Sequence, residues 1–105
     1  MDDDPVRIRF ERTGGFAGFS LRATLDSESL TPEQIEELER LLDQSRFFEL
    51  PVELEAREPA ADRFQYLLTV EHGGRAHTVR AADAAAPDSL RPLLDWLSAA
   101  ARARR

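Results

Sequence analysis

The chain has 105 residues, of which 42% are hydrophobic, and its formal net charge is −6 at pH 7. This length suits a single domain with one core, and the hydrophobic fraction excludes a disordered chain. Cysteine is absent, which excludes disulfides, thiol nucleophiles and thiolate metal sites. We therefore expect one domain over residues 1–105, with tails at residues 1–4 and 102–105.

The net charge and the composition of the two termini indicate which classes of partner the chain does not bind. The negative charge repels nucleic acid and anionic lipid, and the dense basic cluster RARR is confined to the carboxyl terminus. The amino terminus, MDDDPV, is acidic where a secretory signal needs positive charge, and no apolar stretch approaches membrane-spanning length. We expect a cytoplasmic protein that binds neither nucleic acid nor membrane.

Two segments near the amino terminus alternate between apolar and polar residues, as strands with one wet face do. Their apolar positions are Val6, Ile8 and Phe10 in the first segment, and Phe19, Leu21, Ala23 and Leu25 in the second. Gly14 and Gly15 suit a two-residue hairpin turn, because such turns need positive φ. This turn pairs Phe10 with Phe19 and places the apolar residues of both strands on one face.

Phe16 is the exception to this pattern. In unbroken strand geometry its ring points away from the apolar face, on the side of Thr13, and Gly18 leaves room beside it. A bulge at this glycine-rich spot would instead rotate Phe16 back into the core. The residues alone leave both alternatives open.

The next segment, LTPEQIEELERLLDQSRFF, begins with the signals of a helix amino terminus. Thr31 is the expected N-cap, Pro32 takes the first helical position, and Gln34 completes a capping box. The apolar residues at helical spacing are Ile35, Leu38, Leu41 and Leu42. The acidic residues of this helix are interpreted as a solvated face.

Residues 50–62 contain two prolines and no sustained period, so we expect an irregular connection. About a dozen residues is long for a compact domain, and such loops are often functional. A linker that only crosses the edge of the sheet is the alternative.

A second hairpin is predicted around Gly73 and Gly74. Before it, the apolar positions alternate at Phe64, Tyr66, Leu68 and Val70. The turn pairs His72 with Arg75, and this register continues with Val70 opposite His77, Leu68 opposite Val79 and Tyr66 opposite Ala81.

The last segment predicts a second helix. Its apolar stripe is Leu90, Leu93, Leu94, Leu97 and Ala101. Ser89 is the expected N-cap, because it leaves Pro92 in the first turn, where the missing N–H is harmless. Trp96 flanks the stripe and is expected to cover the edge of the core.

These elements together predict an α+β protein. The expected architecture is a four-stranded antiparallel sheet made of two hairpins, with two helices packed on one face in the order ββαββα, a two-layer sandwich.

The inventory of catalytic groups is thin. His72 and His77 flank the second turn on one predicted face, but two ligands without a thiolate or a fixed carboxylate do not complete a zinc site. The RTGGFAG stretch lacks the Lys-Ser/Thr of a phosphate loop. We infer no catalysis and no cofactor. An exposed aromatic residue beside two glycines instead suits an anchor for a protein partner with an apolar pocket.

Four stretches of the sequence together resemble the emfourin family. They are RTGGFAG at residues 12–18, FFELP at 47–51, DRFQYLLTVEHGGRAHTV at 62–79 and LRPLLDWL at 90–97. Emfourins are small bacterial protein inhibitors of protealysin and related thermolysin-like zinc metallopeptidases. The resemblance covers residues 6–97, and its most specific part is the run from Gly14 to Gly18.

The resemblance implies reversible, stoichiometric inhibition by occupation of the active-site cleft of such a peptidase. The partner-binding positions that carry over are Arg12, Gly14, Gly15, Phe16 and Gly18. The ring of Phe16 would fill the pocket for the large apolar side chain after the scissile bond, and Arg12 would pair with a carboxylate at the cleft rim. We expect no metal bound by the chain itself and a monomer when it is free.

A hairpin tip alone is too small for an inhibitor interface of standard size, which buries about 1,600 Å² in total. A second loop must contribute, and the connection from Glu53 to Asp62 is a candidate. Its carboxylates would, as a secondary possibility, reach the zinc ion of the peptidase.

Two other hypotheses stay open at this point. In the first, the chain binds a non-peptidase partner through the same aromatic tip. In the second, it is an enzyme that uses His72 and His77.

Overall fold

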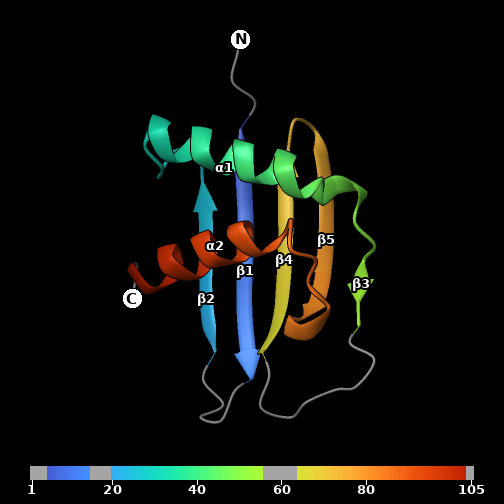
Figure 1. Cartoon of the computed structure of the whole chain (residues 1–105). Helices are drawn as coiled ribbons and strands as arrows, with labels where there is room; N and C mark the ends of the chain where they lie inside the picture. Colours follow the sequence, from blue (N-terminus) through green and yellow to red (C-terminus); the bar gives the residue numbers. More distant parts are fainter. Residues whose placement is uncertain (1–4, 15–19, 56–63, 104–105) are drawn as a thin grey trace.

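The structure, a computed structural model, describes residues 5–14, 20–55 and 64–103. Its elements in chain order are β1 (Val6–Gly14), β2 (Leu21–Asp26), α1 (Pro32–Ser45), η1 (Phe47–Glu49), β3 (Glu53–Leu54), β4 (Phe64–His72), β5 (Arg75–Ala82), η2 (Asp83–Ala85) and α2 (Arg91–Ala103). Both helices run across the strands on one face of a single sheet (Figure 1). The predicted α+β architecture of two layers is therefore correct. Within the described ranges, no helix has the length and apolar character needed to cross a bilayer.

The sheet has five strands in the order β2-β1-β4-β5-β3. Strand β3 is parallel to β5, and the other pairs are antiparallel. The prediction of four antiparallel strands is wrong in this respect. Residues 53–54 add a short parallel edge, supported by a bond of 2.7 Å from the Arg80 N–H to the Val52 carbonyl. Two residues are too few to show an apolar period, so the sequence pattern does not reveal this strand.

The hairpin between β4 and β5 has the predicted register. Both turn glycines have positive φ, 61° at Gly73 and 77° at Gly74, as a type I′ turn requires. All four predicted pairs occur, from His72 opposite Arg75 to Tyr66 opposite Ala81.

The pairing of β1 with β2 differs from the prediction. Phe10 lies opposite Ala23, four residues beyond the expected partner Phe19, and the last pair of the two strands is Arg12 with Leu21. Gly14 pairs with Phe64 of β4 instead of forming a two-residue turn. The physical reason is that a shift by an even number of residues keeps every apolar side chain on the same face, so alternation does not distinguish the two registers.

Helix α1 begins as predicted. The Thr31 hydroxyl accepts from the Gln34 backbone N–H at 3.1 Å, and the Gln34 side-chain oxygen accepts from the Thr31 backbone N–H at 2.9 Å, which completes the capping box. The helix ends at Arg46, whose φ of 51° lies in the left-handed region and whose N–H bonds to the last-turn carbonyls. Of the predicted stripe, Leu38, Leu41 and Leu42 are buried and Ile35 packs at the core edge.

Helix α2 begins at Arg91, and Ser89 is not its N-cap. The Leu94 N–H donates to the Leu90 carbonyl at 3.1 Å, so Leu90 accepts the first helical bond. The Leu90 N–H itself bonds to the Pro87 carbonyl at 2.9 Å in the preceding turn, which delays the start of the helix. The predicted stripe is buried along its whole length, and Trp96 packs against the core edge as expected. The helix continues to Ala103, within the segment predicted as a tail.

The face of the sheet that bears no helix carries charged and polar side chains. Its charged members are the arginines Arg7, Arg9, Arg22 and Arg80 and the carboxylates Glu11, Asp26, Glu53 and Glu71. Glu11 and Arg22 are directly opposed and form an ion pair of 2.6 Å. Opposite charges in neighbouring strands stabilise an exposed antiparallel face, so this surface needs no ligand to account for its composition.

The capping box gives a first prediction. We expect Thr31→Ala to lower the free energy of unfolding by about 1 kcal/mol, because the backbone N–H of Gln34 loses its acceptor, the Thr31 hydroxyl. Urea denaturation monitored by circular dichroism measures this difference. Thr31→Ser keeps the hydroxyl and should stay near the wild type. Equal stability of the alanine variant and the wild type would contradict a contribution of this cap.

Candidate partner-binding site

The strand register gathers three connections at one end of the sheet, which we name the connection end. It is formed by the last residues of β1 and β5 and the first residues of β2 and β4: Gly14, Ala82, Leu21 and Phe64. Gly14 lies opposite Phe64, and Ala82 lies opposite Gln65. The β1–β2 connection, the β3–β4 connection and η2 therefore all meet the sheet at this end, at the bottom of Figure 1.

The structure describes two of the five residues predicted to bind a partner. Gly14 has a φ of 100°, in the region that favours glycine, and Arg12 is half-buried. Gly15, Phe16 and Gly18 lie outside the described residues. The orientation predicted for Phe16 depends on a two-residue turn, and Gly14 does not form that turn. The base of the predicted site is thus located at the end of β1.

Arg12 lies on the same face as the core residues of β1, because alternate residues of a strand share a face. Its neighbours in the adjacent strands are Leu21 and Tyr66, which are both buried. Helix α2 crosses the middle of the sheet, and the strands continue beyond it toward the connection end (Figure 1). Arg12 therefore extends the core face past the helix layer, where its charged head keeps contact with water.

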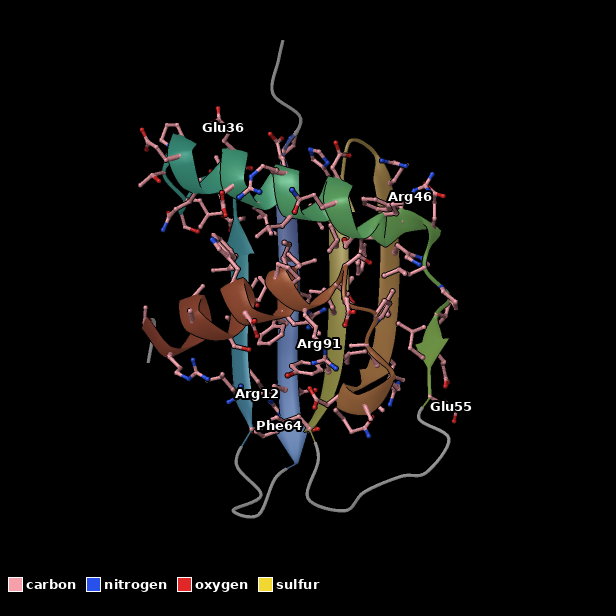
Figure 2. The ribbon with its side chains drawn as sticks, viewed as in Figure 1. Arg12, Glu36, Arg46, Glu55, Phe64 and Arg91 are labelled. Atoms are coloured by element: carbon pink, nitrogen blue, oxygen red, sulfur yellow. The ribbon has the colours of Figure 1, made fainter. Side chains whose placement is uncertain are left out.

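The side chain of Arg12 stacks on Phe64. Its guanidinium carbon lies over the ring, 4.3 Å from the centroid, and Figure 2 shows the two residues side by side. Such contacts contribute about 0.5–1 kcal/mol at exposed sites. Among the described residues Arg12 forms no ion pair. The contact therefore joins the end of β1 to the start of β4 without a carboxylate.

A polar cluster beside Arg12 holds η2 against the sheet and α2. The Tyr66 hydroxyl donates to the Asp83 carboxylate at 3.3 Å. Arg91 forms an ion pair with the same carboxylate at 3.5 Å and donates to the Asp83 backbone carbonyl at 2.8 Å. Burial raises the pKa of Tyr66 above 10.0, and the charge of Asp83 raises it further.

Sequence reasoning missed this cluster. A signal was present, because an arginine in the first turn of a helix opposes the helix dipole unless a carboxylate compensates it. Arg91 occupies that position, and Asp83 directly follows β5. The pairing was not deducible from spacing alone, since the turn between them is irregular.

The second predicted loop is described only in part. Glu53 and Glu55 are exposed, and Val52 is the one large hydrophobic side chain of the described residues that is strongly exposed, at 59%. Residues 56–63, including Glu58 and Asp62, lie outside the described residues. The following residue, Phe64, is opposite Gly14, so this loop and the β1–β2 connection adjoin the same strand pair.

The two histidines have structural partners. The His77 Nε2–H donates to the Leu50 carbonyl at 2.7 Å, and the ring packs edge-on to Phe47. His72 Nε2 lies 3.3 Å from a Glu39 carboxylate oxygen. No group of three metal-ligating side chains occurs within residues 5–14, 20–55 and 64–103. These contacts account for both rings as parts of the fold.

The fold and the connection end together indicate a small α+β protein whose candidate partner-binding elements are the loops at one end of its sheet. A sequence model of the emfourin family matches residues 10–98. A similar solved structure is emfourin from Serratia proteamaculans, an M4 family peptidase inhibitor, with 21% sequence identity, coverage of 89% of this chain and 88% of that chain, and a TM-score of 0.48. No curated protein matches the chain.

The family match covers most of the chain, so the protein belongs to the emfourin family. Emfourins are peptidase inhibitors and not enzymes. The resemblance seen in the sequence is thereby confirmed, and so is the inference that the chain is not an enzyme.

The environment of Tyr66 gives a second prediction. It is the single tyrosine of the sequence, so the ultraviolet absorbance of the phenolate reports its titration alone. We expect a midpoint above 10.0 in the folded protein, because burial and Asp83 disfavour the phenolate. Asp83→Asn should lower the midpoint while leaving it above 10.0, because burial is the larger cause.

The raised pKa of Tyr66 also makes the stability of the protein depend on pH. The folded pKa exceeds the unfolded one, so the contribution of Tyr66 to stability is complete below pH 10 and is lost as the pH rises through the folded pKa. The protein unfolded in denaturant serves as the reference. Identical midpoints for the folded and unfolded chain would show that the phenol is not in the environment described.

Proposed function

We propose that this protein inhibits a thermolysin-like zinc metallopeptidase of the protealysin type by occupying its active-site cleft. The observation that carries the proposal is membership of the emfourin family over residues 10–98. The register adds a structural reason, because it brings the start of the RTGGFAG motif and the end of a long second connection to one end of the sheet. Two segments at one end suit a cleft better than a single tip.

The proposed contact residues are Gly14, Gly15, Phe16 and Gly18, with Arg12 at the base of the same motif. In this mechanism Phe16 fills the pocket that thermolysin-like enzymes offer to a large apolar side chain after the scissile bond. The glycines let the backbone approach the cleft closely. An anchor carried on a segment whose ends are held by the sheet loses little conformational freedom on binding.

The β3–β4 connection is the proposed second contact segment. An inhibitor interface of standard size buries about 1,600 Å² in total, which exceeds the surface of one short loop. Glu55, the last described residue before this segment, is exposed, and the segment ends at Phe64 beside Gly14. Its carboxylates are candidates for an approach to the zinc ion of the peptidase, as a secondary feature of the proposal.

The direct test is a titration. We expect the purified protein to abolish hydrolysis of a peptide substrate by a thermolysin-like peptidase near one-to-one stoichiometry. The inhibition should be reversible on dilution, and the inhibitor should be recovered uncleaved in a mass spectrum. Undiminished hydrolysis at a large excess of the protein, tested against several such peptidases, would refute the proposal and favour an interaction module with another partner.

The role of Phe16 has its own test. We expect Phe16→Ala to raise the inhibition constant at least tenfold, about 1.4 kcal/mol, with little change in the melting temperature. Phe16→Leu is the matched control, because it keeps a large apolar side chain for the pocket. A large fall in melting temperature for the alanine variant would place the ring in the core instead.

A further inference from the structure

Arg12 belongs to the motif proposed to bind the peptidase, yet the structure gives its side chain an internal partner. Its guanidinium lies over the Phe64 ring at 4.3 Å from the centroid, and both residues are half-buried (Figure 2). Phe64 lies opposite Gly14, two residues beyond Arg12 on β1. The contact therefore spans the strand pair where the β1–β2 and β3–β4 connections begin and end.

We propose that Arg12 is a positioning residue that acts through Phe64 and does not itself contact the peptidase. By stacking on the ring, it holds the end of β1 against the start of β4. One contact then sets the departure points of both connections relative to each other. This inference rests on the proposed function for its consequence in inhibition, although the contact itself is a feature of the free protein.

The chemistry of the two side chains suits this role. A guanidinium is planar and weakly hydrated, so it stacks on an aromatic face without losing its contact with water. The neighbours of Arg12 in the adjacent strands, Leu21 and Tyr66, are buried and confine its stem. A side chain held in this way on the core face is directed along the sheet, where Phe64 lies.

The opposite end of the sheet contains a matched contact. Arg75, which follows the Gly73–Gly74 turn, lies over the ring of Phe48 with 4.2 Å between the guanidinium carbon and the centroid. The two contacts have the same chemistry and nearly the same distance. The Arg75 contact adjoins none of the connections proposed to bind the peptidase, so its removal is a control for a general loss of stability.

The experiment is a double-mutant cycle with Arg12→Met, which keeps the aliphatic stem, and Phe64→Leu, which keeps an apolar side chain. We expect each single variant to raise the inhibition constant three- to tenfold. The double variant should have an inhibition constant no higher than that of the more strongly affected single variant, because both substitutions remove the same contact. Arg75→Met should leave the inhibition constant unchanged. Melting temperatures establish that all four variants are folded.

Two results would overturn the inference. If Phe64→Leu leaves inhibition unchanged while Arg12→Met weakens it equally in both backgrounds, Arg12 contacts the peptidase directly. If Arg75→Met weakens inhibition as much as Arg12→Met, the effect is a general loosening of the fold.

Hydrogen exchange of the free protein separates this inference from the proposed function. We expect Arg12→Met and Phe64→Leu each to accelerate exchange in the peptides that contain the end of β1 and the start of β4, and Arg75→Met to leave those peptides unchanged. This result would support the contact even for a chain that inhibits no peptidase. Unchanged exchange in both variants would overturn the inference whatever the inhibition assay shows.

Discussion

The antiparallel pairing of β1 with β4 is the constraint on which the rest of the structure depends. These strands are at the centre of the sheet, and they bring together segments from the two halves of the chain. Their inner faces carry Ile8, Phe10, Leu68 and Val70, which are buried under the helices. The same pairing sets Gly14 beside Phe64, so two connections that are remote in sequence leave the sheet together. Loss of this register would remove both the core and the proposed binding surface.

The two helices cover one part of the inner face of the sheet, and other groups cover the part toward the connection end. Where α1 and α2 lie over the strands (Figure 1), the inner face is apolar and buried. Beyond α2, toward the connection end, the same alternation continues with Arg12, Phe64 and Tyr66, and the cover is provided by stacking and by the Asp83–Arg91 pair. The burial of a side chain thus depends on how far along the strand it lies, as well as on which face of the sheet it belongs to. This arrangement explains how an arginine occupies a position with core alternation in a stable sheet.

The two hairpins show how far alternation determines a register. At Gly73 and Gly74 the turn geometry and the apolar pattern agree, and the predicted pairs are those observed. Between β1 and β2 the pattern is compatible with several registers that differ by even shifts, and the glycine pair predicts a register that is not the one observed. The long-range pairing of Gly14 with Phe64 competes with that local turn and prevails. The prediction from local glycines is correct at Gly73 and Gly74 and wrong at Gly14, which pairs with another strand.

The sequence by itself determined the helices, the inner faces of the strands, the second hairpin and the family, because caps, apolar periods and tight turns are local and the family motifs are contiguous. Only the tertiary structure decided the fifth strand, the register of β1 with β2 and the partners of Arg12 and Asp83. A two-residue strand has no period, an even shift leaves the pattern unchanged, and a contact such as that of Arg12 with Phe64 depends on which distant strand lies alongside. The residues proposed to contact a peptidase follow from the motif, whereas the way the sheet holds their base follows from the fold.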